Sequence, residues 1–257
     1  MTQGERRVYL IKYLLAEDDE YSGIEIPADE TDQKRLLRSL MNVRPAKPIG
    51  ADFLSVQNDY LQEATAEKGI TDFKTLTPVR DGIYIWQGDI TSLRCGAIVN
   101  AANSGMTGCY QPCHSCIDNC IHTYAGVQLR LKCAEIMRRQ GHPEHTGTAK
   151  ITPAYNLPCE YVIHTVGPIV DGRLNERHWE LLSSCYRSCM VLADEYKVGS
   201  IAFCCISTGV FGYPNEEAAV TAVETISAYR AETGSNTEVI FNVFKDKDKR
   251  IYEQLLG

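Results

Sequence analysis

The sequence contains no long apolar run. No window approaches the roughly 18 consecutive apolar residues that a membrane-spanning helix requires. Residues 1–10, MTQGERRVYL, also lack the continuous apolar core and the small-residue cleavage site of a secretory signal. We therefore expect a cytoplasmic protein that has no membrane partner.

An excess of basic residues is absent as well. The formal net charge is −7 and the pI is about 5.4, whereas a nucleic-acid-binding protein usually shows a basic face. The phosphate-binding fingerprints GxxxxGK(S/T) and GxGxxG do not occur. We therefore expect no nucleic-acid partner. A phosphate-containing ligand is still compatible with the sequence, because helix N-termini and backbone N–H groups hold phosphates without net positive charge.

The composition is that of a globular protein, and two regions differ in pattern. Of the 257 residues, 44% are hydrophobic and 23% are charged, which allows a sizeable core. Residues 1–72 show helical periodicity, in ERRVYLIKYLLAED and TDQKRLLRSLMNV, interrupted by a proline-containing segment. We expect a helical N-terminal extension over 1–72 and a larger domain over 73–257.

From residue 73 onward, short strand-like runs alternate with helical stretches. Such alternation predicts an α/β fold whose sheet carries helices on both faces and binds ligands at the carboxyl ends of its strands. One long helix is expected over 117–139, a second opens at 214–217, and a last one covers 247–256. The predicted strands are 83–86, 97–100, 161–166, 200–204 and 238–244.

The eleven cysteines are odd in number, which disfavours a closed disulfide framework. Cys109, His114 and Cys116 form a C-x4-H-x-C arrangement on a loop before the long helix. Thiolate and imidazole are ligands that zinc prefers, and three of them leave the open position typical of catalytic zinc. Cys113 or Cys120 could add a fourth ligand, which would close the site or hold an iron–sulfur cluster. Redox-active or merely buried cysteines are the other interpretation.

Three titratable residues have ordinary structural interpretations by position. An acid at a helix N-terminus, such as Asp118, is favourable with the helix dipole. His122 lies one turn into the same helix and suits a packed side chain. His164, inside the apolar run YVIHTV, suits a core histidine with satisfied hydrogen bonds.

Polar and glycine-containing segments follow three of the predicted strands. Asp89 follows the first strand and Asn103 the second, where each could bond a ligand or form a turn. The segment 207–214, STGVFGYP, connects a strand to a helix, and its glycines would let the backbone approach a phosphate.

Taken together, five segments resemble the macrodomain family. They are GDIT (88–91), IVNAANS (98–104), IDNCIHTYAG (117–126), GTAKITPAYNLPCEYVIHTVGP (147–168) and STGVFGYP (207–214). Where most macrodomains have a glycine-rich loop, this chain has GCYQPCHSC, which resembles the zinc-dependent macrodomains. These are microbial enzymes that remove ADP-ribose from modified proteins and carry a similar N-terminal helical extension. The resemblance implies a three-layer α/β/α macrodomain with a mixed, mainly parallel sheet over 73–257.

The resemblance also implies roles for individual residues. Asp89 and Ile90 would hold the adenine, and Asn103 would contact the distal ribose. One zinc ion would bind to Cys109, His114 and Cys116, and the catalytic residues would be Asp118 and Asn103. The other ligand-binding residues would be Ile117, Asn119, Ser207, Thr208, Gly209, Val210 and Phe211, with Asp118 beside the scissile bond.

Two functions from different classes follow. The first is a zinc-dependent hydrolase that removes mono-ADP-ribose from protein side chains, through an ester-like linkage to an acidic residue as the family suggests. The second is a non-catalytic reader of ADP-ribose with structural zinc. An open coordination position beside a carboxylate favours the enzyme, and a fourth protein ligand favours the reader. A thiol redox protein using Cys113 and Cys116 is a third interpretation, which nothing else in the chain supports.

Overall fold

The central sheet of the computed structural model has six strands in the order β2-β8-β7-β4-β6-β5. All neighbours are parallel except β5, which runs antiparallel to β6 at one edge. The structure describes residues 1–21 and 23–257. The strands are β2 (Ile83–Gln87), β4 (Ala97–Ala101), β5 (Ala149–Pro153), β6 (Tyr161–Thr165), β7 (Ser200–Phe203) and β8 (Glu238–Val243), and a separate parallel pair is formed by β1 (Thr71–Asp72) and β3 (Leu93–Arg94).

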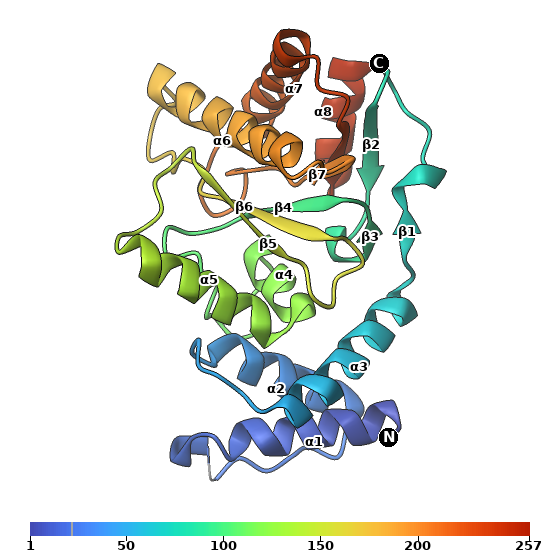
Figure 1. The fold of residues 1–257 in the computed structure, drawn as a ribbon, viewed down its shortest axis with the longest axis vertical. Helices are drawn as coiled ribbons and strands as arrows, with labels where there is room; N and C mark the ends of the chain where they lie inside the picture. The colour runs from blue at the N-terminus through green and yellow to red at the C-terminus, as the bar shows by residue number, and fades with distance from the viewer. Residues whose placement is uncertain (22) are drawn as a thin grey trace.

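Helices cover both faces of the sheet, which confirms the predicted three-layer α/β/α architecture (Figure 1). One face carries α4 (Ile117–Ala125) and α5 (Val127–Gln140), and the other carries α6 (Glu176–Glu195), α7 (Asn215–Thr233) and α8 (Asp246–Leu256). The strands β4, β7 and β8 are buried along nearly their whole length because helices lie above and below them.

The N-terminal region forms three helices that pack beside α4 and α5, far from α6 and α7 (Figure 1). They are α1 (Gln3–Leu15), α2 (Glu30–Val43) and α3 (Ala51–Lys68). Their apolar faces meet in a second, smaller core that also includes Val127 at the start of α5. Within the part of the chain that the structure describes, no helix combines the length and apolar character needed to cross a bilayer.

The prediction of one continuous helix over 117–139 is wrong, because Gly126 separates α4 from α5. Gly126 has φ +93°, and a Cβ there would lie 2.6 Å from Nε2 of Gln57. The side chain of Gln57 instead accepts a hydrogen bond from Val127 N at 3.0 Å. A residue of α3 therefore caps the first turn of α5, which leaves no room for a side chain at position 126.

Around Gln57, side-chain amides connect α3 to the larger domain. Gln57 Nε2 donates to Gln128 Oε1 at 2.7 Å. Asn58 Oδ1 accepts from Gln128 Nε2 and from Asn156 Nδ2, both at 2.9 Å. Asn156 Nδ2 also donates to Ala125 O at 3.0 Å. The N-terminal helices are thus attached by directional hydrogen bonds as well as by apolar contact.

Candidate active site and metal loop

The residues singled out in the sequence lie at the end of the sheet where its parallel strands finish. Parallel strands bring their carboxyl ends to the same edge. The turn that contains Asp89 follows β2, Asn103 follows β4, and the 207–213 segment follows β7. The strand order places β4 and β7 side by side, so two of these segments are neighbours.

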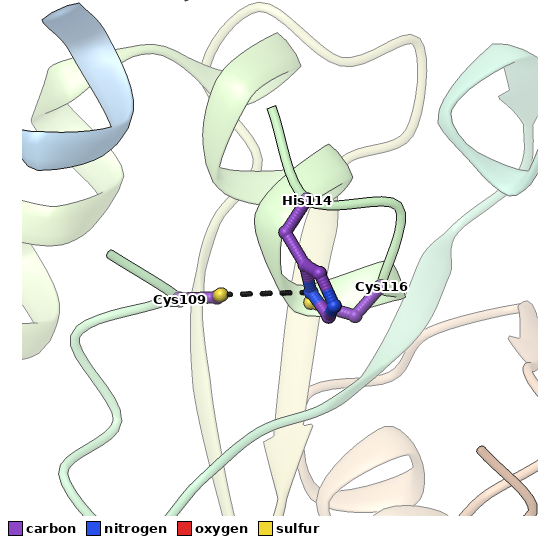
Figure 2. A group of neighbouring side chains, drawn as sticks. All are labelled: Cys109, His114 and Cys116. Atoms are coloured by element: carbon purple, nitrogen blue, oxygen red, sulfur yellow. Dashed lines mark hydrogen bonds between the residues drawn. The ribbon is translucent and has the colours of Figure 1, made fainter. Parts of the chain in front are cut away.

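The metal loop, residues 109–116, brings together the three candidate ligands (Figure 2). The ligand atoms of Cys109, His114 and Cys116 all lie within 4.8 Å of one another, and Cys109 Sγ is 3.7 Å from His114 Nδ1. Cys116 is the N-cap of α4, and its Sγ accepts a hydrogen bond from Asn119 N at 3.4 Å. Two sulfur atoms and one imidazole nitrogen match the donor set that zinc prefers.

The sulfur atoms of the two neighbouring cysteines, Cys113 and Cys120, contact α2 instead of these ligands. Cys113 Sγ lies 3.2 Å from Ser39 Oγ and donates to Arg35 O at 3.4 Å, both on α2. Cys120 Sγ accepts from Arg38 Nη2 at 3.5 Å. Within the described residues, the candidate metal site therefore has three ligand atoms. Cys116 belongs to it, whereas Cys113 contacts α2.

Gly108 fixes how closely the metal loop approaches α4. It has φ +88°, and a Cβ at this position would lie 2.8 Å from Cγ of His122. His122 is a packed histidine, as expected, and burial together with the nearby His164 and Arg130 lowers its pKa well below the usual range. Because His122 stays neutral, the loop rests on an uncharged ring.

Asp118 lies directly after the metal loop and is held by two asparagine side chains. Its Oδ1 accepts from Asn100 Nδ2 at 2.8 Å, and its Oδ2 accepts from Asn103 Nδ2 at 3.2 Å. Asn103 Nδ2 also donates to Gly108 O at 3.2 Å, which connects the carboxylate to the loop. Asp118 is only 4% exposed, and burial raises its pKa to about 6 against the opposing effects of Asn100, Arg130 and Asn103.

Asn100 is a site residue that the sequence interpretation missed. Its side chain is fully buried in β4, and its Nδ2 lies 3.1 Å from Nδ1 of His164. Thr152 Oγ1 lies 3.0 Å from the other nitrogen of His164, so the prediction of a satisfied core histidine is confirmed. The available signal was a polar side chain inside the apolar run IVNA, which needs a buried partner.

Asp89 forms a turn and an ion pair just after β2. Its Oδ1 accepts from Thr91 N at 3.0 Å and from Thr91 Oγ1 at 2.7 Å, and its Oδ2 accepts from Lys68 Nζ at 2.9 Å. Burial raises the pKa of Asp89, but the bonds from Thr91 and Lys68 outweigh it, so the pKa is lowered. The side chain of Ile90 is buried, which leaves its backbone to meet a ligand.

Phe244 was not foreseen as a neighbour of Asp89. Its ring is 74% exposed at the end of β8. Gly88 N donates to Val243 O at 3.1 Å, which brings Phe244 beside the turn that holds Asp89. An exposed aromatic ring next to a carboxylate can stack on a nucleobase.

The phosphate loop, residues 207–212, leaves donors open. Among the described residues, the N–H groups of Gly209, Val210 and Phe211 donate no hydrogen bond, whereas those of Thr208 and Gly212 donate to Cys205 O and Gly209 O. Ser207 is buried, and its hydroxyl also has no hydrogen-bond partner among the described residues. Val210 is 80% exposed. A loop with successive free N–H groups is suited to an anion.

The remaining two candidates lie in the first turn of α4. Ile117 is partly buried against the main core. Asn119 is fully buried, and its Nδ2 donates to Cys109 O at 3.3 Å and to Gln111 O at 2.9 Å. The side chain of Asn119 therefore holds the metal loop, and it has no free face for a ligand.

The chain matches the model of the Macro domain over residues 99–222. It is 58% identical to a protein-ADP-ribose hydrolase of Treponema medium, with both chains fully covered. It is 49% identical to a protein-ADP-ribose hydrolase of Staphylococcus aureus, over 97% of this chain and 94% of that protein.

Among solved structures, a Trypanosoma brucei macrodomain in complex with ADP-ribose superposes with a TM-score of 0.67. The two chains are 27% identical, and the alignment covers 85% of this chain and 95% of the trypanosomal one. The fold, the strand-edge site and these similarities agree, and the chain belongs to the macrodomain family.

Proposed function

We infer that this chain is a hydrolase that removes ADP-ribose from modified proteins. Two relatives that carry the name protein-ADP-ribose hydrolase are 58% and 49% identical and match nearly the whole length, including the N-terminal helices. The solved trypanosomal macrodomain holds ADP-ribose. The site edge of this chain offers a carboxylate, an exposed aromatic ring and free N–H groups, which suit an adenine and a diphosphate.

The hydrolase is zinc-dependent, with one zinc ion per chain held by Cys109, His114 and Cys116. The observation that carries this proposal is the convergence of the three donor atoms within 4.8 Å. A zinc ion with an open position would polarise an oxygen of the ribose or of the linkage as a Lewis acid.

Asp118 acts on the water that attacks the anomeric carbon of the distal ribose. Its pKa of about 6 leaves it ionised at neutral pH, yet high enough to accept a proton. Asn100 and Asn103 fix both carboxylate oxygens, so the base cannot rotate away from the water. The carbonyl oxygen of the Asn103 amide, which accepts from Gly105 N at 2.9 Å, also accepts from a ribose hydroxyl.

The substrate is ADP-ribose in an ester-like linkage to an acidic side chain. Asp89 accepts from the exocyclic amine of adenine through Oδ2, which only Lys68 contacts among the described residues. The N–H groups of 209–211 bind the diphosphate, so no lysine is required there.

Residues 1–72 are an extension of this domain.

The reader alternative needs a fourth protein ligand, and Cys113 and Cys120 instead bond to α2. The deciding experiment incubates the purified chain with a mono-ADP-ribosylated protein, with and without a chelator. We expect release of ADP-ribose that stops on chelation and returns with added zinc. Full activity in metal-free protein would show that zinc has no catalytic role. Binding of ADP-ribose without turnover would favour the non-catalytic ADP-ribose-binding module.

A further inference from the structure

Four residues of α2 contact the metal loop, three of them through their side chains and Arg35 through its backbone carbonyl alone. Arg35, Arg38, Ser39 and Asn42 are spaced by three, one and three positions, which places them on one side of a helix. This side points away from the apolar stripe that contains Leu37, Leu40 and Met41 and joins the N-terminal core. The helix is therefore two-sided, with one side for its own core and one for the loop.

Arg38 makes the most contacts of the four. Its Nη2 donates to His114 O at 2.7 Å and to Asn119 Oδ1 at 2.9 Å. The first bond holds the backbone of a candidate metal ligand. The second fixes the amide of Asn119, whose Nδ2 holds the carbonyls of Cys109 and Gln111. One guanidinium thus controls both ends of the loop, 76 positions away from His114 in the sequence.

Asn42 holds the middle of the loop. Its Oδ1 accepts from Cys113 N at 2.9 Å, and its Nδ2 donates to Thr123 Oγ1 at 2.9 Å. Cys113 has φ +53°, a conformation that costs free energy for a residue with a side chain. The contacts of Asn42 and Ser39 hold Cys113 in this conformation and turn its sulfur away from the other donors.

We propose that Arg38 is a positioning residue that pre-arranges the metal loop, so that the N-terminal extension forms the outer shell of the zinc site. The proposal rests on the zinc site of the proposed function. A loop without regular structure must bring three metal-binding side chains together. Each contact that fixes the loop before the metal binds reduces the conformational entropy lost on binding. Removal of a residue that supports metal ligands typically costs about 10–100-fold in metal affinity or activity.

The test compares three full-length variants. Arg38→Met removes the donors and keeps an unbranched side chain with good helix propensity. Arg38→Lys keeps the charge and one donor nitrogen, but its shorter side chain does not place that nitrogen where the guanidinium Nη2 makes its bonds. Arg35→Met is the matched control, since Arg35 is an exposed arginine on the same helix whose side chain has no hydrogen bond or ion pair among the described residues.

Two measurements are made on each variant. Competition with a coloured chelator should show zinc bound about 10–100-fold more weakly by Arg38→Met, an intermediate loss for Arg38→Lys and none for Arg35→Met. Hydrogen exchange on the zinc-free proteins should show faster exchange of the amides of residues 111 and 113–116 in Arg38→Met, a smaller increase in Arg38→Lys and none in Arg35→Met. ADP-ribose affinity should stay at the wild-type value in all three.

Equal zinc affinity and equal loop exchange in Arg38→Met and wild type would overturn the proposal. Faster exchange throughout the domain, with ADP-ribose affinity lost in parallel, would also overturn it and assign Arg38 to general stability. If the wild type binds no zinc, the metal part of the proposed function fails separately, and the exchange comparison still decides whether Arg38 orders the loop.

Discussion

The metal loop and the phosphate loop border the same site but differ in how much of their hydrogen-bonding capacity is already used. Asn119, Arg38 and Asn42 bond to the backbone of the metal loop at four points, Cys109 O, Gln111 O, Cys113 N and His114 O. In the phosphate loop, three successive N–H groups from Gly209 to Phe211 donate to nothing among the described residues.

Under the proposed function, the difference follows from what each loop would bind. Metal ligands must meet within tenths of an ångström, so their supports are built in advance. A diphosphate brings its own acceptors, and open N–H groups are the receptor for them. The predictions below test whether the site is rigid at one end and open at the other.

The largest effect is expected for a metal ligand. Cys116→Ser should lose bound zinc and reduce turnover by more than the ~10²–10⁴-fold typical of removing a general base. Cys113→Ser is the control, because its sulfur faces Ser39 and Arg35. Metal analysis and the release of ADP-ribose measure both. Loss of zinc from the Cys113 variant alone would mean that the ligand set is wrong.

Asp118→Ala should come next, with a fall of ~10²–10⁴-fold in turnover, the range for general-base removal. Zinc content and ADP-ribose affinity should remain close to wild type. Single-turnover kinetics separate the chemical step from binding. An unchanged rate would exclude Asp118 as the base and restrict it to a packing role with Asn100.

Asp89→Ala should weaken ADP-ribose binding by about 1–3 kcal/mol, the cost of an unpaired buried donor. The substitution also removes the turn with Thr91 and the pair with Lys68. Lys68→Met separates these contributions, since it keeps the carboxylate, and we expect it to lower the free energy of unfolding by about 0.2–1 kcal/mol. Calorimetry on both variants measures the difference. Equal affinity in Asp89→Ala and wild type would refute an adenine role.

The smallest effect is expected for Gly209→Ala. A Cβ at Gly209 meets no atom within 4 Å, so stability should change by less than about 0.5 kcal/mol. ADP-ribose affinity should fall measurably, because the added methyl group lies where the diphosphate approaches the backbone. Thermal unfolding and calorimetry test the two statements separately. A stability loss without an affinity loss would mean that this loop is not open.

The sequence predicted most of what depends on local pattern. Alternating apolar runs gave the five parallel strands within a residue or two at each end, and the spacing of Cys109, His114 and Cys116 identified the group that the structure brings together. The antiparallel β5 was not among the predicted strands. Its burial pattern is mostly intermediate, as suits an edge strand, and so its apolar signal is weak.

Contacts between distant segments could not be predicted. Gly126 ends α4 because Gln57 occupies the space, and Gln57 lies 70 positions before the residue that it caps. Arg38 and Lys68 looked like ordinary charged residues on solvated helix faces, yet they reach His114 and Asp89. Such roles depend on which surfaces pack against each other in the folded protein, and a single sequence carries no periodic signal for these contacts.

The amide groups around Gln57 and Asn58 also determine how the molecule should come apart. Each hydrogen bond exchanged for water costs about 0.5–1.5 kcal/mol, and peeling the N-terminal helices away would break those to Gln128 and Asn156 and expose the apolar core that includes Val127. Partial opening at this seam therefore loses polar and apolar contacts together, and we expect its free energy to lie close to that of complete unfolding. The two cores should melt as one cooperative unit, with a single transition and matching calorimetric and van't Hoff enthalpies.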